Sequence, residues 1–199
     1  MNNTVEPEVS DACRVRDGFV IPQGELWVFG YGSLMWDPGF THDHSCPALL
    51  RGYHRAFCIY SVRFRGTYEK PGLVLGLNRG GACRGIAFRV PAAQVASAVV
   101  ALWAREMPRA VYLPRTVRLT LADKTVDALA FVANTRHDHY VGDLALDDTA
   151  RVIACCSGLR GHNTEYLCNT LRHLDQLGVR DTTLHKLYRR VLDLQAAQT

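Results

Sequence analysis

"VFGYGSLMW", residues 28–36, is an apolar run that is broken in its middle by a glycine on each side of a tyrosine. The segment leading into it, Leu26–Phe29, has the composition of a short buried strand. Glycine adopts backbone angles that other residues resist and leaves neighbouring N–H groups uncovered, so a tight turn is expected at Tyr31. Such a turn is either plain architecture or a cradle for an anionic group. The pattern at this turn does not distinguish the two interpretations, so the other segments of the chain are needed.

The segments around this turn have strand patterns first and helix patterns last. Strands are expected at residues 26–29, within 48–64, and at 73–78, 84–90, 115–121 and 125–132, with a hairpin turn at Arg79-Gly80-Gly81. Helices are expected from Pro91 to Met107, from an N-cap at Asp147 to a stop at Gly158, near 163–176 and near 181–197. Strands with one embedded helix, followed by helices, are typical of an α+β fold and not of a doubly wound parallel sheet.

The length and composition of the chain suit one soluble domain. Its 199 residues are 48% hydrophobic, which is enough for a substantial core, and the net charge of +4 is too small to indicate a nucleic-acid partner. Residues 1–24 are polar and are expected to form a flexible leader, with a single domain over 25–199. No segment has the apolar length of a signal peptide or of a membrane span, so the sequence predicts a cytoplasmic protein without a membrane partner. It does not indicate the oligomeric state.

One carboxylate falls on the apolar stripe of the helix that follows Pro91. Val95, Val99 and Leu102 have the three-to-four spacing of a buried helix face. At about 100° per residue, Glu106 lies within roughly 40° of all three, so its side chain is expected to point where they point. It is either a helix-end glutamate that turns to solvent or pairs with an arginine, or a half-buried acid whose raised pKa suits proton transfer. The spacing alone leaves both interpretations open.

Two His-Asp-His runs are the candidates for a metal site. They occupy residues 42–44 and 137–139, in polar segments that resemble loops, where successive histidines are usually just exposed. The seven cysteines include no Cys-x-x-Cys pair, and the adjacent Cys155 and Cys156 suit helix packing. The sequence therefore predicts neither a metal nor another cofactor.

Three further segments have weaker functional patterns. Residues 51–70 interleave basic and aromatic side chains, as nucleic-acid platforms do, but a half-exposed strand pair produces the same pattern. The run SGLRGHN at 157–163 lacks the Gly-Lys-Ser/Thr ending of a phosphate loop and suits a helix connection or the rim of a pocket. Ser33 lacks the Gly-x-Ser-x-Gly setting of a nucleophile elbow, so it is expected to supply a hydroxyl and an N–H, not to form an acyl-enzyme.

Four segments together resemble the ChaC-type γ-glutamylcyclotransferases. They are VFGYGSLMW (28–36), PGLVLGLNRGGACRGIAFRV (71–90), LWAREM (102–107) followed by Tyr112 and Pro114-Arg115, and YVGDLALDDTARVIACCSGLRGHNTEYL (140–167). The resemblance extends in order from about Leu26 to the last expected helix. It implies a compact γ-glutamylcyclotransferase-like fold: a small mixed β-barrel or sheet flanked by helices, with a helical C-terminal part.

The resemblance also implies an activity, the cleavage of glutathione into 5-oxoproline and cysteinylglycine without a cofactor. Glu106 is implied to be the catalytic acid/base. The substrate-binding residues are assigned as Tyr31, Gly32, Ser33, Leu34 and Tyr140. In this chemistry the substrate's own α-amine attacks its γ-carbonyl, so the protein supplies a proton-transfer group and N–H donors. The alternatives are a cyclotransferase for other γ-glutamyl amines or amino acids, and a non-catalytic regulatory module linked to cation transport.

Overall fold

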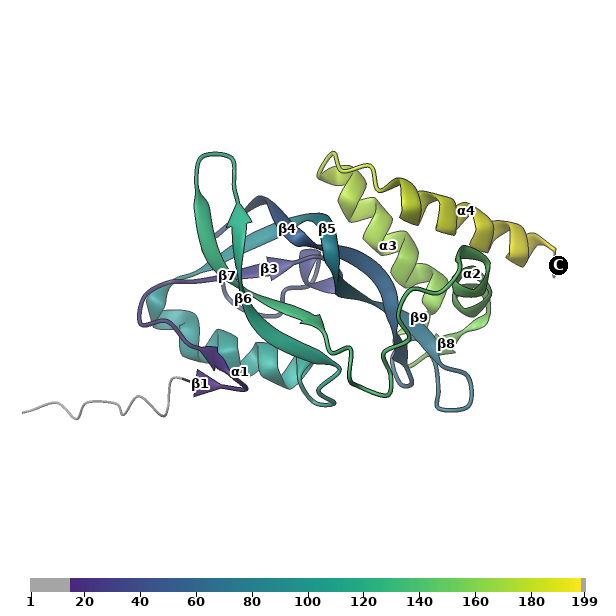
Figure 1. Ribbon diagram of the computed structural model, residues 1–199, viewed down its shortest axis with the longest axis horizontal. Helices are drawn as coiled ribbons and strands as arrows, with labels where there is room; N and C mark the ends of the chain where they lie inside the picture. The colour runs from purple at the N-terminus through teal and green to yellow at the C-terminus, as the bar shows by residue number, and fades with distance from the viewer. Residues whose placement is uncertain (1–14, 198–199) are drawn as a thin grey trace, which may run out of the picture.

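The computed structural model describes residues 15–197, and its central feature is a closed β-barrel of five strands (Figure 1). The strands are β3 (Leu26–Gly30), β4 (His44–Ser61), β5 (Gly72–Val90), β6 (Tyr112–Thr120) and β7 (Thr125–Ala133). They are ordered β3-β5-β4-β6-β7, and β7 closes the barrel by pairing in parallel with β3, whereas the other neighbours are antiparallel. The predicted α+β fold with a small barrel is confirmed.

Within residues 15–197, four α-helices flank the barrel, and they lie on two sides of it (Figure 1). On one side lies α1 (Val95–Glu106), and on the other α2 (Leu146–Cys155), α3 (Asn163–Gln176) and α4 (Thr182–Ala196) pack against one another. The carboxylate of Asp181 caps α4 by accepting the Leu184 N–H at 3.1 Å. None of the helices within residues 15–197 has both the length and the apolar character needed to cross a membrane.

The buried face of α1 is the stripe that its spacing predicts. Val95, Val99 and Leu102 are 4%, 2% and 1% exposed, and they pack in one apolar cluster with residues of β3, β5 and β7. The helix ends at Glu106, with Met107 as its C-cap. The Glu106 carboxylate therefore stands at the end of an apolar face that is packed on the barrel.

The hairpin expected at Arg79-Gly80-Gly81 does not form, so this prediction was wrong. Residues 72–90 are one continuous strand, β5, which pairs along its length with β4. Gly80 and Gly81 have positive φ values of 98° and 68°, and Gly52 in the facing part of β4 has a φ of 82° beside a β-bulge. The glycines therefore bend two long strands together and do not reverse either of them.

Helix α2 differs from the prediction at both ends. Asp147 lies inside its first turn and is not the N-cap, because its carboxylate binds Arg190 of α4 at 2.8 and 3.0 Å. The helix also ends before Gly158, which belongs to a two-stranded hairpin of β8 (Ser157–Gly158) and β9 (Gly161–His162). The predicted helix connection is thus a hairpin, and it packs against loop 62–71 beside the site described below.

A second small hairpin occupies residues 15–20, which the sequence assigned to a flexible leader over 1–24. Strands β1 (Val15–Arg16) and β2 (Phe19–Val20) pair there, and Phe19 is 4% exposed with its ring 6.0 Å from that of Trp103 on α1. The leader prediction is wrong for these residues, because an aromatic anchor packs them on the core. Residues 1–14 of the predicted leader lie outside the described residues.

Candidate active site

The turn after β3 is a point of close approach between three parts of the chain. Strand β3 ends at Gly30, and Ser33–Met35 forms a single 3₁₀ turn. A Cβ atom at Gly30 would lie 3.0 Å from the ring of Phe88, and one at Gly32 would lie 3.0 Å from the hydroxyl oxygen of Tyr166. A side chain at the first position would therefore crowd the barrel wall, and one at the second position would crowd a polar side chain from α3.

The backbone of this turn leaves several N–H donors without acceptors. Its first internal hydrogen bond runs from the Met35 N–H to the Gly32 carbonyl oxygen at 2.9 Å. Among the described residues, no acceptor pairs with the N–H groups of Gly32, Ser33 or Leu34. N–H donors of one turn that lack an acceptor suit a carboxylate or a developing oxyanion. This geometry supports the interpretation of the turn as an anion cradle.

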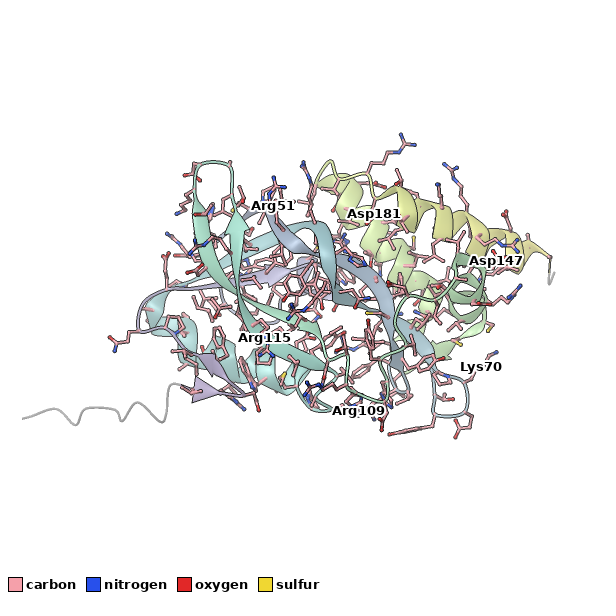
Figure 2. All side chains as sticks on the ribbon, viewed as in Figure 1. Arg51, Lys70, Arg109, Arg115, Asp147 and Asp181 are labelled. Carbon is pink, nitrogen blue, oxygen red and sulfur yellow. The ribbon has the colours of Figure 1, made fainter. Side chains whose placement is uncertain are left out.

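A buried arginine, Arg55, holds the turn in place. Its side chain is 3% exposed, and its Nε donates to the Tyr31 carbonyl oxygen at 2.6 Å. Its Nη2 donates to the Arg84 carbonyl oxygen of β5 at 2.6 Å, and its Nη1 lies 3.4 Å from Asp181, which is labelled in Figure 2. Arg55 therefore ties the turn to β5 and to the start of α4.

A second arginine, Arg105, connects Glu106 to the turn. Its Nε lies 3.0 Å from Glu106 Oε1, and its Nη2 donates to Ser33 Oγ at 2.9 Å. Its Nη1 contacts Asp37 through both the carbonyl oxygen and the carboxylate of that residue. The helical spacing gave no indication of this bridge, since Arg105 lies about 100° from Glu106 around α1. The guanidinium reaches from the end of α1 to the turn after β3.

The Glu106 carboxylate is largely buried. Its side chain is 14% exposed, and burial raises its pKa, while the positive charges of Arg105 and Arg160 act in the opposite direction. Features of both interpretations of the sequence therefore occur in this residue. It pairs with an arginine at a helix end, and it is also a buried acid with a raised pKa.

Two buried tyrosines and one half-buried tyrosine lie close enough to Glu106 for its negative charge to raise their pKa values. Tyr31 and Tyr112 donate their hydroxyls to backbone carbonyl oxygens of β7 and β5 at 2.8 and 2.9 Å. The third, Tyr166, touches the turn at Gly32. Burial is the largest cause of the raised pKa of each, which for Tyr166 reaches about 12. Three tyrosines with raised pKa values therefore lie within electrostatic range of the carboxylate.

Sequence reasoning missed Tyr112 and Tyr166, as well as the two arginines. Tyr112 opens β6 just after the helix that ends at Glu106, and Tyr166 is in α3 near the other end of the chain. Each belongs to a segment that carries the family resemblance, but an aromatic residue in a strand or helix pattern suits a core position equally well. Only the fold brings the two hydroxyls to the same carboxylate.

Tyr140 is not brought into this group. Its backbone pairs with Ile59 of β4 in an isolated bridge. Burial, followed by the charges of Cys58 and Asp143, raises its pKa. It shares with Tyr112 only the small apolar cluster around Cys58 and Ile59. Its assignment to substrate binding stays a prediction.

The two His-Asp-His runs have ordinary structural contacts. The His42 ring lies 4.9 Å from that of Phe88, and Asp43 pairs with Arg89 at 2.9 Å. In the second run, Nδ1 of His137 accepts the N–H of residue 139 at 3.0 Å. Over residues 15–197, no three His, Cys, Asp or Glu side chains gather in a group that could hold a metal ion.

Two surface depressions lie on the barrel away from Glu106. One, of about 380 Å³, is lined by β4, β6 and β7 and includes Arg51 and Arg115, which Figure 2 labels. The other, of about 370 Å³, is lined by residues of β2, β3 and β7. Neither includes Glu106 or the turn at 31–34, so the candidate site rests on the constellation of side chains and not on the size of a cavity.

Comparison with known proteins shows the family and fold to which the chain is similar. Residues 26–194 match the model of the ChaC-like protein family. The glutathione-specific γ-glutamylcyclotransferase of Escherichia coli (strain K12) is 40% identical over 166 residues, which cover 83% of this chain and 72% of that protein. The glutathione-specific γ-glutamylcyclotransferase 1 of Homo sapiens is 36% identical over 147 residues, covering 71% and 66%. A crystal structure of a γ-glutamyl cyclotransferase specific to glutathione from yeast has the same fold, with a TM-score of 0.79 at 22% identity over 85% of this chain and 96% of that one.

Proposed function

The chain belongs to the ChaC-like family, and from this premise we propose that it is a γ-glutamylcyclotransferase that cleaves glutathione to 5-oxoproline and cysteinylglycine. Two of the relatives described above, at 40% and 36% identity, bear the name of this activity. The observation that carries the proposal is the position of Glu106. Nε of Arg105 lies 3.0 Å from this buried carboxylate. Nη2 of the same arginine donates to Ser33 in the turn that offers N–H donors.

The first step is the loss of a proton from the substrate's α-ammonium group. Glu106 accepts this proton, because burial makes its carboxylate a better base than an exposed one. The positive charges of Arg105 and Arg160 limit the rise of its pKa and so favour the ionised form. One residue can therefore meet both requirements of a general base, ionisation and basicity.

The second step is ring closure. The α-amine nitrogen forms a bond to the γ-carbonyl carbon, and the N–H groups of the turn at residues 31–34 stabilise the oxyanion that develops. The bond from that carbon to the cysteine nitrogen then breaks, and the departing amine takes the proton from Glu106. The ring nitrogen gives up its second proton as the lactam forms, and this proton converts the released amine into an ammonium group. Atoms balance without water or a cofactor. Because the nucleophile is tethered to its target, folding the γ-glutamyl chain over supplies much of the rate enhancement.

A direct assay tests this proposal. Purified protein is incubated with glutathione in the presence of a strong chelator, and 5-oxoproline and cysteinylglycine are quantified. The two products should appear in equal amounts and at the same rate without the chelator. Release of 5-oxoproline only from other γ-glutamyl amines or amino acids would favour the alternative substrate class. Loss of activity that a divalent ion restores would contradict the metal-free mechanism.

We expect Ser33→Ala to weaken glutathione binding without stopping turnover. The Ser33 hydroxyl accepts one hydrogen bond from Arg105, and losing one or two such bonds at a buried polar site costs about 1–3 kcal/mol, or roughly a 5- to 150-fold rise in KM. Ser97→Ala, which removes an exposed hydroxyl from the same helix as Arg105, is the control and should match wild type. A covalent γ-glutamyl adduct on Ser33 in a mass spectrum would contradict this positioning role.

The pH dependence should follow the raised pKa of Glu106. A general base acts in its ionised form, so kcat/KM should be fully present above this pKa and be lost as the pH falls through it. We expect the acid midpoint to lie above the ordinary glutamate value of about 4.3, because desolvation is the largest cause of the shift. Arg105→Gln removes a charge that lowers this pKa and should move the midpoint to higher pH, whereas Arg105→Lys should not. A pH–rate profile with equal midpoints in all three proteins would contradict this.

Three statements about the surroundings of the protein remain predictions from the sequence. They are a cytoplasmic location, the absence of a membrane partner and the absence of a nucleic-acid partner. The reaction proposed here needs only a small-molecule substrate.

A further inference from the structure

Two loops that meet beside the site carry three arginines around an exposed phenylalanine. The N–H groups of Leu159 and Arg160 donate to the carbonyl oxygens of Arg63 and Phe64, each at 2.9 Å. The guanidinium carbons of Arg160 and Arg63 lie 4.9 and 5.6 Å from the centre of the Phe64 ring, and Phe64 is 43% exposed. The β8–β9 hairpin and loop 62–71 thus form one surface, the arginine rim, whose three arginines are Arg63, Arg65 and Arg160.

Arg65 connects the arginine rim to the candidate site. Its guanidinium carbon lies 5.5 Å from the ring centre of Tyr166, and its Nη1 donates to the His162 carbonyl oxygen at 2.9 Å. The Tyr166 hydroxyl touches the turn at Gly32. One aromatic ring therefore separates Arg65 from the turn that is proposed to hold the γ-glutamyl group. The charge of Arg160 acts on both Arg65 and Glu106, lowering the pKa of each. The rim therefore lies at the outer edge of the site.

Acidic neighbours do not neutralise the positive charge of the rim. The Glu106 carboxylate is already paired with Arg105. Glu165 lies 3.4 Å from Arg65 but is 58% exposed, so this contact is weak. Arg160 is exposed and makes no ion pair with any residue that the structure describes. A guanidinium without an acidic partner is left at the edge of a site that takes an anionic substrate.

The basic character continues onto neighbouring segments. The guanidinium carbon of Arg109, which follows α1, lies 5.5 Å from the ring centre of Tyr68 in loop 62–71. Figure 2 shows Arg109 and Lys70 along the lower edge of the molecule. Loop 62–71 itself has three basic residues and one acidic residue, Glu69. The local field at this edge therefore favours an anion.

We propose that Arg160, supported by Arg65, binds the carboxylate at the far end of the substrate, two residues beyond the bond that is cleaved. This inference rests on the proposed function, which puts the γ-glutamyl group at the turn. Two extended residues span about 7 Å, a length that suits a subsite one aromatic ring away from the cradle. A guanidinium pairs with a carboxylate through two parallel hydrogen bonds. The rim would thereby select a γ-glutamyl peptide acid over a neutral γ-glutamyl amine.

The test compares glutathione with its glycine monoethyl ester, which lacks only the distal negative charge. Wild-type protein should have a kcat/KM for glutathione about 10- to 100-fold higher than for the ester, since the ester loses a charge-assisted contact. Arg160→Gln should remove most of this difference by lowering the glutathione value alone, and Arg160→Lys should retain part of it. The matched control is Arg118→Gln, at a 74% exposed arginine of β6, which should keep the wild-type ratio.

Calorimetric titration of the Glu106→Gln variant with both compounds separates this inference from the proposed function. Suppose that the variant binds glutathione more tightly than the ester while wild-type protein releases no 5-oxoproline. This result would support the carboxylate subsite and contradict the proposed reaction. A ratio near one in both kcat/KM and binding overturns the subsite. An Arg160→Gln loss that is equal for the two compounds also overturns it, because that result indicates a structural role for Arg160.

Discussion

Glu106→Gln is expected to lower kcat for 5-oxoproline release by at least about 10²- to 10⁴-fold, the range typical of general acid–base catalysis. Glutamine has nearly the same shape as glutamate and can still accept a hydrogen bond from Arg105, which lies 3.0 Å from Oε1. It cannot accept the proton of the α-ammonium group. Glutathione binding, measured by calorimetry, should largely survive, because the proposed contacts to the γ-glutamyl group come from the turn and not from this carboxylate.

The fold should also survive this substitution. Burial disfavours the charged form of Glu106, so replacing it by a neutral side chain offsets the loss of the ion pair. Arg105 keeps its contacts with Ser33 and Asp37. Thermal unfolding should therefore remain close to wild type, and Glu25→Gln, an exposed carboxylate before β3, should change neither stability nor rate. A near wild-type rate would make Glu106 only a helix-end charge, and loss of folding would make it structural.

The elements that the sequence predicts well are those whose pattern is local. The buried stripe of α1 and the bounds of α3 follow from apolar residues that repeat with the helix period. The glycine pair at residues 80–81 fails as a predictor because it suits a hairpin and a bend equally well. The partner strand β4 determines that the glycines form a bend and not a hairpin, because Gly52 bends β4 at the place where β5 bends. Asp147 fails as an N-cap for a similar reason, because its partner Arg190 is 43 residues away.

The candidate site also contains features that a local sequence pattern predicts and features that it does not. The spacing along α1 indicates which way Glu106 points, and the glycines indicate a turn that exposes N–H donors. Neither pattern indicates which residues contact the carboxylate or the turn. Arg105 bridges to Ser33 across 72 residues of sequence, and Arg55 binds the turn across 24. Side chains that are brought together over such separations carry no local signal, so the sequence predicted the acid and the cradle but not the groups that join them.

N-acetylglutathione should yield no detectable 5-oxoproline, a fall of at least about 10³-fold relative to glutathione. Acetylation turns the α-amine into an amide, whose nitrogen cannot attack the γ-carbonyl, and so removes the advantage of a tethered nucleophile. S-methylglutathione is the matched control, because it blocks the thiol and leaves the amine free, and it should be cleaved. Both compounds are followed by chromatography of the released cysteinylglycine or its S-methyl form.

Incorporation of oxygen from water is a second measurement that identifies the attacking group. Ring closure uses no water, so 5-oxoproline formed from glutathione in ¹⁸O-enriched water should contain no label at its ring carbonyl. Hydrolysis would give glutamate with ¹⁸O in its γ-carboxylate, and N-acetylglutathione would then be cleaved to N-acetylglutamate at a comparable rate. In that case the attacking group would be a water molecule or the Ser33 hydroxyl, and Glu106 would have to act as the base for that group. An unlabelled product together with an inert N-acetyl compound leaves the substrate's own amine as the nucleophile, and the protein's contribution is then the proton transfer at Glu106 and the donors of the turn.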